Sequence, residues 1–460
     1  MNHRWALGPV LLALTMCAPA PELQPEPSPT TAPAAGAVPT RAMVERDPAP
    51  AVGPDLSADL EKLWHRRVTP RVKRDLWKNA QRYDAAYLFM LPLHASFERR
   101  YVPGQQEFAD HVARFLEYRD SVVLKADAQI SWLQYFYFLS RFTVLAATHD
   151  RADLIPQELP LVLRGWIGNL WLRGPAVQWN RKPFPGGVRE RLGWKLSGAP
   201  GVKGKSYERA ILDQELLLFA IAADLRRYGR TVGSQLATDP LLREIDSVAR
   251  RVYEQRVAWN ADSGWVFQPG VWRDHKDHLY ACRLEKRPGL EPCSGSAGAE
   301  DASHSHRLPL ILRSMAEADP VGSAGRAYYE HLVWGLERQF FARVAEPPSE
   351  GFAWWRIRNY MDGQNGIYRW EYATLGPNQG YGPYELSGAL LHGWWTFLPG
   401  ERAGELYRTL AGQFPLNEQQ LALYGGPGRR PGSAGLIGDG TAELICRLSA
   451  ELQRSAYGGQ

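Results

Sequence analysis

The sequence has few cysteines, no strong bias of charge and no long apolar run after its first residues. Only four of its 460 residues are cysteine, and 54 basic side chains oppose 49 acidic ones, which leaves a formal charge of +5. Nothing in this overall balance of charge indicates a nucleic-acid-binding module, and we expect no nucleic-acid partner. Past the N-terminal segment, no stretch approaches the roughly 20 apolar residues of a membrane span. No repeat period of 34 or 40 residues is present, which argues against TPR and HEAT solenoids.

The N-terminal segment predicts export. Residues 1–16 have a basic start and then an apolar run that is too short to span a bilayer, as in a secretory signal peptide. Residues 1–17 end in Leu14-Thr15-Met16-Cys17, which resembles the bacterial lipobox, in which the cysteine is lipidated after cleavage. Met16 departs from the small residue of that pattern, so cleavage within Ala18-Pro19-Ala20 is the alternative. We expect a membrane-anchored lipoprotein that faces the periplasm or cell surface, or otherwise a periplasmic or secreted protein.

Residues 18–54 predict a disordered tether. They contain ten prolines and nine alanines in 37 positions, a composition that cannot bury a core and favours extended chain. Hydrophobic residues make up 45% of the whole sequence, so the remaining chain can fold. We therefore expect residues 55–460 to form a single helical domain behind a Pro/Ala-rich tether.

The rest of the chain predicts an all-α fold with few short strands. Apolar residues recur at helical spacing in most segments, and many of these segments end at glycine or proline. Short strands are expected only near residues 265–268 and 366–374. The candidate helices lie within 56–98 (broken at Pro70 and Pro92), 105–118, 127–148, 156–173, 206–228, 239–258, 305–318, 323–343, 381–397, 401–412 and 440–455.

The aromatic content and a His-bearing stretch point toward glycans. The sequence has 17 Trp and 20 Tyr, and such side chains stack on sugar rings. Helical hairpins joined by aromatic loops in an exported protein resemble the α/α-toroid (six-hairpin) carbohydrate-active enzymes, which include glycosidases and polysaccharide lyases. Locally, Asp301-Ala-Ser-His304-Ser-His306-Arg307 is similar to the His-bearing loops at helix starts of toroid lyases. The resemblance covers about residues 56–455, and it implies a toroid or incomplete toroid of helical hairpins with long aromatic loops.

The resemblance favours a polysaccharide lyase that acts on an acidic, uronate-containing polysaccharide. In β-elimination a base removes the proton next to the uronate carboxylate, a cation neutralises the enolate, and an acid protonates the leaving oxygen. His304 or His306 is the expected base and Arg307 the neutralising cation. The candidate acids and the nearby carboxylate are Tyr372, Tyr381, Tyr384 and Glu385.

Two other functions stay open. A glycoside hydrolase would need two carboxylates at a defined separation, and the candidates for that pair are Asp362, Glu371 and Glu385, with Asp213 or Glu215. Alternatively, the protein is a non-catalytic surface lipoprotein that binds a glycan or another partner with the same aromatic residues.

Two loops supply the expected substrate-binding residues. In residues 351–385, aromatic and amide side chains alternate around turn-forming glycines, which suits sugar hydroxyls and ring faces. Residues 176–206 contain seven Lys/Arg, one acid and interleaved aromatics, which suits an acidic glycan or an anionic lipid surface. The candidates are Trp354, Trp355, Asn365, Trp370 and Asn378 in the first loop, and Trp179, Arg189, Arg191 and Trp194 in the second.

The remaining cysteines and a His/Asp cluster complete the candidate sites. Cys282 and Cys293 bracket a loop and predict a disulfide in an oxidising compartment, whereas Cys446 falls in an apolar helical pattern and predicts a buried thiol. We favour no cofactor. A divalent metal is the competing use of polar residues near this loop, with Asp274, His275, Asp277 and His278 as its ligands.

Overall fold

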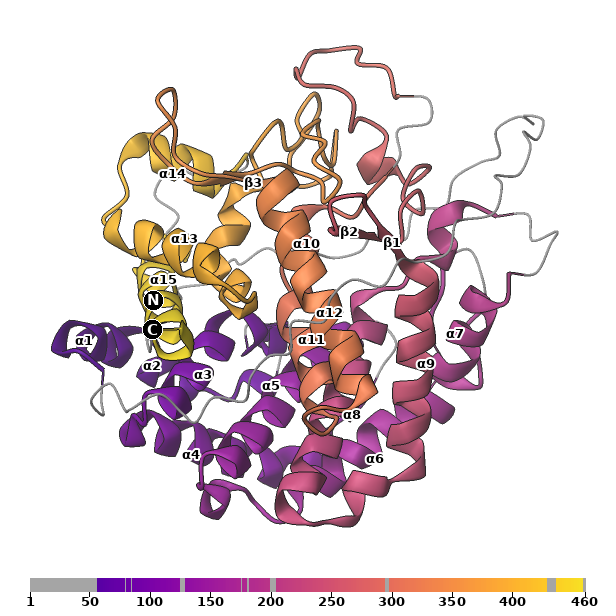
Figure 1. Ribbon diagram of the computed structural model, residues 1–460, viewed down its shortest axis with the longest axis vertical. Coiled ribbons are helices and arrows are strands. Elements are labelled where there is room, and N and C mark those ends of the chain that lie inside the picture. The colour runs from indigo at the N-terminus through magenta and orange to yellow at the C-terminus, as the bar shows by residue number, and fades with distance from the viewer. Residues whose placement is uncertain are drawn as a thin grey trace, which may run out of the picture. The chain divides into compact units, whose positions relative to one another are not determined.

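A computed structural model describes residues 56–457 except 79, 84, 125–128, 175, 180–181, 199–203, 294–297 and 428–435. Every described residue belongs to one compact unit, which lies within Pro48–Gln460. The predicted signal segment, the lipidation site Cys17 and the tether of residues 18–54 lie outside the described residues. The described part is rich in helices and has few short strands, which confirms the all-α prediction (Figure 1).

Helices account for most of the described chain. The α-helices are α1 (Ala58–Arg67), α2 (Thr69–Val72), α3 (Met90–Glu98), α4 (Val102–Tyr118), α5 (Gln129–Thr148), α6 (Leu159–Leu172), α7 (Gly187–Leu196), α8 (Asp213–Val232), α9 (Pro240–Arg256), α10 (Ala302–Ser305), α11 (Leu308–Glu317), α12 (Ala324–Gln339), α13 (Glu401–Gly412), α14 (Glu418–Gly425) and α15 (Thr441–Tyr457). The shorter 3-10 and π-helical segments are η1 (Leu76–Lys78), η2 (Ala80–Tyr83), η3 (Ala85–Phe89), η4 (Arg119–Ser121), η6 (Ala152–Leu154), η7 (Ser206–Arg209), η8 (Gln235–Thr238), η9 (Lys276–His278), η10 (Phe340–Val344), η11 (Ser387–His392) and η12 (Trp394–Phe397).

Local capping signals explain where several helices begin and end. Asp239 precedes α9 and accepts hydrogen bonds from the backbone N–H groups of Leu241 (2.8 Å) and Leu242 (3.2 Å). These bonds satisfy donors that have no partner within the helix. At the other end of α8, Gly233 adopts φ 70°, a left-handed conformation that glycine accepts without steric cost and that stops the helix.

Burial separates inner helices from outer ones. Helix α5 is buried without interruption from Trp132 to Ala147, and α8 is buried from Glu215 to Leu225. A helix that is covered on all sides belongs in the interior. By contrast, α9 buries one stripe of apolar residues and exposes its remaining surface, as expected for an outer helix.

The inner helices contact one another in a continuous series. Helix α3 contacts α5, α5 contacts α8, α8 contacts α11, α11 contacts η12, η12 contacts α15, and α15 contacts α3 again. More exposed helices pack against them, with α4 on α3, α6 on α5, α9 on α8, α12 on α11 and α13 on α15. None of the helices in the described ranges is both long and apolar enough to cross a membrane.

The strands are short and lie in the connections between helices. β1 (Val257–Trp259) pairs antiparallel with β2 (Trp265–Phe267), and β3 (Ala345–Glu346) pairs antiparallel with β4 (Arg356–Ile357). The strand predicted near 265–268 is therefore confirmed. The strand predicted near 366–374 is wrong, because that segment forms only an isolated bridge between Tyr368 and Tyr381.

The helix predicted over 381–397 is also wrong. Instead, the chain forms the two short segments η11 and η12, separated by Gly393. Gly393 adopts φ 79°, so the regular α-helical hydrogen bonding cannot continue through it. The apolar spacing that predicted a helix arises because both short segments are buried.

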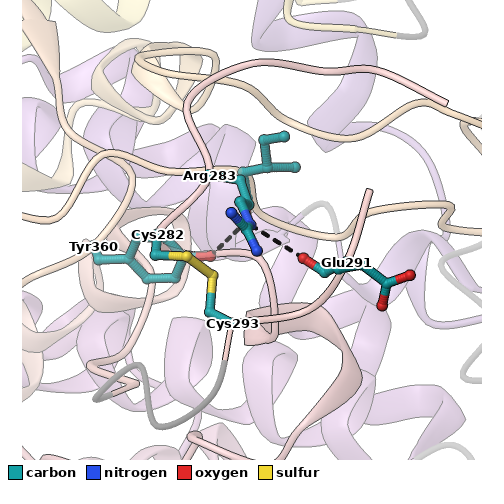
Figure 2. The surroundings of a disulfide bond; sticks show 6 residues. Cys282, Arg283, Glu291, Cys293 and Tyr360 are labelled. Carbon is teal, nitrogen blue, oxygen red and sulfur yellow. Dashed lines mark hydrogen bonds between the residues drawn. A yellow bond between two sulfur atoms is a disulfide. The ribbon is translucent and has the colours of Figure 1, made fainter. Parts of the chain in front are cut away.

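The predicted disulfide between Cys282 and Cys293 is present (Figure 2). Their Cα atoms are 6.2 Å apart, and Arg283 Nε donates a hydrogen bond to the Glu291 carbonyl within the closed loop (3.1 Å). A bridge that closes a loop of this size contributes about 3 kcal/mol to stability in the chain-entropy model. Cys446 is a fully buried free thiol on α15, which confirms that prediction as well.

Candidate functional site

The starts of α8 and α11 meet at an ion pair between Asp213 and Arg307. Asp213 is the first residue of α8, and Arg307 directly precedes α11. Arg307 also donates hydrogen bonds to the hydroxyl groups of Tyr87 and, at 3.1 Å, Tyr83. Burial opposes the charge of Arg307, but Asp213 and the two tyrosines raise its pKa well above the ordinary value. A permanent positive charge is thus fixed where these helices begin.

One helical turn earlier, Asp301 and His304 form a carboxylate–imidazole pair. Asp301 caps α10 by accepting from the backbone N–H groups of Ser303 (3.1 Å) and His304 (3.2 Å), and its Oδ2 lies 2.8 Å from His304 Nδ1. Burial would raise the pKa of Asp301, but His304 and the hydrogen bonds hold it far below its usual range. Burial likewise would lower the pKa of His304, but the Asp301 carboxylate outweighs it and raises that pKa.

His304 keeps an accessible edge. Its side chain is 33% exposed, whereas that of Asp301 is 4% exposed. Nδ1 is occupied by Asp301, and the Nε2 atom has no hydrogen-bond partner within the described ranges. A basic imidazole, oriented by a carboxylate and open at its second nitrogen, can take a proton from a bound molecule.

Glu300 adds a neutral acid to the same turn. It is 7% exposed, and the Ser305 hydroxyl donates a hydrogen bond to its Oε2 (3.1 Å). Burial raises the pKa of Glu300, and the carboxylates of Asp213 and Asp301 raise it further, to about 8. Glu300 is therefore protonated at neutral pH and can act as a hydrogen-bond donor or an acid. The sequence analysis missed it, since its only local signal is an acidic residue before a helix cap.

His306 lies on the buried side of the turn. Its side chain has no exposed surface, and its Nδ1 lies 2.5 Å from the Ser303 carbonyl oxygen. Its ring packs against His392, with 5.2 Å between ring centroids, and against Tyr87. Burial, and then the nearby His392 and Arg307, lower the pKa of His306 well below its ordinary value. Of the two histidines predicted as a base, only His304 is thus accessible.

Residues 351–385, which we call the aromatic–amide loop, contact the start of α10. The Ala302 N–H donates to the Asn359 carbonyl (2.9 Å), and the Met361 N–H donates to the Glu300 carbonyl (3.0 Å). The buried Asn359 amide then donates to the Gly366 carbonyl (2.9 Å), which holds the loop closed. The two loops that were predicted to carry the chemistry are therefore adjacent.

The three tyrosines predicted as the catalytic acid contact residues other than His304 and Arg307. Tyr372 lies under the Arg369 guanidinium, 4.7 Å from the ring centroid, and Tyr381 pairs through its backbone with Tyr368. The Tyr384 hydroxyl donates to Glu346 Oε1 (3.0 Å).

The predicted carboxylates also have partners. Glu385 accepts hydrogen bonds from Lys286 Nζ (2.8 Å) and from the Gly382 N–H (2.6 Å). Asp362 accepts from the Gln364 N–H (2.9 Å), and Glu371 is exposed. Glu215 is fully buried between Arg191 and Lys195 and is excluded from contact with a substrate. Of the candidate carboxylates, only Asp213 lies beside His304 and Arg307.

A row of rings leads away from the Asp301 turn, and we call it the aromatic wall: Trp179, Tyr207, Trp272, His275 and His278. Trp272 and His278 stack with 5.4 Å between centroids and planes 9° apart, and Tyr207 meets His275 edge-on at 4.8 Å. His278 also contacts the ring of Tyr360, whose backbone pairs with Asp301. Most of the wall is only half-buried, so its ring faces and edges are partly accessible.

Three of the predicted substrate-binding residues are buried. Arg191 has no exposed surface, and its guanidinium binds Glu215 (2.9 Å) and the Val177 carbonyl (2.7 Å). Trp355 and Trp370 are 4% and 8% exposed and pack in apolar clusters. All three side chains pack against protein partners, and none of them belongs to the Asp301 turn.

The other predicted binding residues are partly accessible. Trp179 belongs to the aromatic wall, Trp194 lies under Arg209, and Trp354 meets Phe352 edge-on. Arg189 is exposed near Glu244, 3.6 Å away. The two asparagines shape the loop: Asn365 Oδ1 accepts from the Tyr384 N–H (2.9 Å), and Asn378 adopts φ 57°.

The residues that were predicted as metal ligands do not share one partner. Asp274 accepts hydrogen bonds from the backbone N–H (2.8 Å) and hydroxyl (2.5 Å) of Ser206, and Asp277 binds Arg369 (2.9 Å). His275 accepts from the Asp277 N–H, and burial lowers the pKa of His278 to about 3. Among the residues that the structure describes, no three His, Cys, Asp or Glu side chains are close enough to share a metal ion.

No protein-family model, curated protein or solved structure matches this chain. What the site does must therefore be inferred from its own geometry and chemistry.

Proposed function

We propose that the protein is an exported, glycan-active enzyme with an α/α-toroid fold, and that it is a polysaccharide lyase. The toroid is supported by the contacts between inner helices, which run from α3 through α5, α8, α11 and η12 to α15 and return to α3. The outer helices α4, α6, α9, α12 and α13 supply the second member of the hairpins that contain α3, α5, α8, α11 and α15. In this arrangement the starts of α8, α10 and α11 share one end, where the polar cluster lies.

The single observation that carries the lyase proposal is the Asp301–His304 pair beside Arg307. His304, with Nδ1 held by Asp301 at 2.8 Å, removes the proton on the carbon next to the uronate carboxyl group. As that C–H bond breaks, a C=C bond forms and the glycosidic C–O bond breaks, so the leaving oxygen takes up a proton. The positive charge of Arg307 and the protonated carboxyl group of Glu300 stabilise the charge that develops on the substrate carboxyl group.

Tyr83 is the acid that the contacts favour. Its side chain is exposed, and its hydroxyl accepts a hydrogen bond from Arg307 (3.1 Å) and lies 2.7 Å from that of Tyr87. An exposed hydroxyl beside the fixed charge of Arg307 is placed to pass its proton to the leaving oxygen. Within the described part of the chain, Tyr372, Tyr381 and Tyr384, the acids expected from the sequence, make no hydrogen bond with Arg307.

Hydrolysis is the second candidate, and one observation favours it. Glu300 has a pKa of about 8 and lies close enough to Asp213 for that carboxylate to raise it, while Asp213 is ion-paired with Arg307. A neutral carboxylic acid near an ionised carboxylate is the combination that glycosidases use. Under this alternative Glu300 protonates the leaving oxygen, and Asp213 activates water or attacks the sugar.

We expect the purified protein to cleave a uronate-containing polysaccharide and to form products that absorb in the ultraviolet. The absorbance reports the new C=C bond, so it distinguishes elimination from hydrolysis, which releases reducing ends alone. A panel of uronate polymers is assayed for both signals, with and without divalent metal. Glu300→Gln keeps the neutral hydrogen-bonding group but removes the transferable proton, so it should spare elimination and abolish hydrolysis. Binding of these polymers without either product would refute both mechanisms and support a binding protein.

Export and lipid anchoring belong to the same proposal. The disulfide Cys282–Cys293 supports export, because such bonds persist mainly in oxidising compartments. We expect Cys17→Ser to release the protein from the membrane fraction or to leave it unprocessed, because the acylated sulfur is lost. Cell fractionation and the mass of the mature N-terminus measure this. Lipidation at Cys17 would be ruled out if the Cys17→Ser protein still fractionated with membranes and were processed like the unaltered protein.

A further inference from the structure

A second polar feature lies outside the Asp301–His304 site. It is a pocket of about 300 Å³, lined by Ser206, Arg209, Arg256, Pro269, Gly270, Val271 and Arg273. Its three arginines come from different segments: Arg209 ends η7, Arg256 ends α9, and Arg273 follows β2. Among the described residues no acidic side chain lines this pocket, so the charges of its described lining are all positive.

The three guanidinium groups lack the anionic partners that arginines in folded proteins usually have. Within the described ranges, Arg209, Arg256 and Arg273 form no ion pair. Arg209 Nη2 and Arg256 Nε are buried and have no hydrogen-bond partner there. In the described part of the chain, Arg256 donates to one acceptor, the Lys195 carbonyl, through Nη2 (2.7 Å). Buried donors of this kind are costly unless an acceptor meets them.

The charges of Arg209 and Arg256 also favour a bound anion. Burial lowers the pKa of Arg256, and the charge of Arg209 lowers it further, so the two cations repel each other. Two acidic residues adjoin these arginines in sequence, Glu208 and Asp274: neither belongs to the described lining of the pocket, and Asp274 accepts hydrogen bonds from Ser206. A bound anion would relieve the repulsion and satisfy the free N–H groups at once.

We propose that this pocket binds a tetrahedral oxyanion carried by the glycan, and that the preferred substrate is a sulfated uronate polymer. A carboxylate has two oxygens and is satisfied by one guanidinium fork. Three guanidinium groups arriving from three segments suit the three terminal oxygens of a sulfate ester. This inference rests on the proposed glycan-active function, and it adds the chemical class of the substituent.

The aromatic wall connects the pocket to the proposed catalytic turn. Tyr207 follows the pocket residue Ser206, and Trp272 precedes the pocket residue Arg273. Trp272 stacks on His278, which contacts Tyr360 next to the Asp301 turn. Figure 1 shows β2 and α10 at the same end of the helices. A polymer that stacks along the wall would place one substituent in the arginine pocket while another residue of the polymer meets His304.

The first experiment measures anion binding without any glycan. Inorganic sulfate and phosphate should raise the melting temperature saturably, whereas acetate and chloride at equal ionic strength should not. Arg273→Ala should weaken sulfate binding at least tenfold, and because Arg273 is exposed the variant should fold. The matched control is Arg251→Ala, an exposed arginine on α9 outside the pocket lining, which should bind sulfate normally. Equal stabilisation by acetate, or unaltered sulfate binding by Arg273→Ala, would overturn the proposal.

The second experiment compares a sulfated uronate polymer with its chemically desulfated and its phosphorylated counterparts. The sulfated polymer should have a kcat/KM at least tenfold above that of the desulfated one, and Arg273→Ala should reduce that ratio toward one. Equal cleavage of the two polymers refutes the sulfate preference while leaving the enzyme proposal intact. Saturable binding of inorganic sulfate with no cleavage of any polymer refutes the enzyme proposal while leaving the oxyanion pocket intact. Preference for the phosphorylated polymer would overturn the assignment to a sulfate ester.

Discussion

His304→Ala is expected to lower kcat/KM for elimination by about 10²–10⁴-fold, the usual contribution of a general base. His304 is the histidine whose Nδ1 is held by Asp301 and whose side chain is 33% exposed. The loss is measured as the rate of ultraviolet absorbance on the best uronate polymer. His65→Ala is the matched control, because His65 is an exposed histidine on α1 and its removal should leave the rate unchanged. A His304→Ala protein that retains more than about half of the activity would refute the assignment of the base.

The pH profile separates a catalytic role of His304 from a structural one. A base must be neutral to accept a proton, so the rate should rise with pH as His304 loses its own proton. The Asp301 carboxylate raises the pKa of His304, and hence Asp301→Asn should move this acidic limb to lower pH as well as reduce the rate. The profile is recorded as kcat/KM against pH for both proteins. An acidic limb that does not move would mean that a different group controls the reaction.

Arg141→Ala is expected to lower the free energy of unfolding by about 3–5 kcal/mol. Arg141 on α5 and Asp224 on α8 are 1% and 0% exposed, and Arg141 Nη1 lies 2.8 Å from Asp224 Oδ1. Removing one partner leaves the other charge buried and uncompensated, which costs far more than losing an exposed pair. Denaturant unfolding measures the change. Arg343→Ala breaks an exposed ion pair with Asp262 and should cost no more than about 1 kcal/mol.

The same variant should show a defined pH dependence. Burial raises the pKa of Asp224 above its unfolded value, while Arg141 lowers it, so losing Arg141 raises it further. A carboxyl group with a raised folded-state pKa contributes stability that is lost as pH rises through that pKa. The deficit of Arg141→Ala should therefore be larger at pH 8 than at pH 5. The double variant Arg141→Met, Asp224→Leu removes both charges and should recover much of the lost stability. If its free energy of unfolding is as low as that of Arg141→Ala, the buried-charge explanation is contradicted.

Most helices could be predicted from the sequence, because the capping and helix-breaking residues that define them act within a few positions. The Asp239-Pro240 cap at the start of α9 and the break near Pro70 are visible without tertiary information. The predicted break at Pro92 is wrong for a local reason as well. Pro92 lies in the first turn of α3 (Met90–Glu98), where a backbone N–H has no helical acceptor and its absence costs little.

Helix α7 was missed because part of its buried face is charged. Val188, Arg191, Leu192 and Lys195 follow helical spacing and are all buried, but two of them are cations. Their common partner is Glu215, at least 20 residues away on α8. Apolar periodicity cannot reveal a helix whose inner face is completed by a distant carboxylate, and residues 176–206 were interpreted as a basic loop for that reason.

The candidate site was predicted only in part. The Asp301 cap and the His-bearing turn are local features, and the sequence identified both. The choice between His304 and His306 depends on which side of the turn is buried, and the roles given to Glu300 and Tyr83 depend on charges contributed by Asp213 and Arg307. Those contacts join segments that are roughly 90 to 220 residues apart in sequence, so no local pattern contains them.

Helix α15 has a consequence for how the chain reaches its native state. It packs against α1 and α3, and Arg71 of α2 donates a hydrogen bond to Thr441 across 370 residues of sequence (2.9 Å). At synthesis rates of 5–20 residues per second, about 20–70 s separate the appearance of these two partners. Until then the apolar faces of the early helices lack their final cover, and contacts between such distant segments are slow to form. A nascent chain of this kind remains incompletely folded for most of its synthesis, and its apolar surfaces are open to aggregation and to proteases during that time.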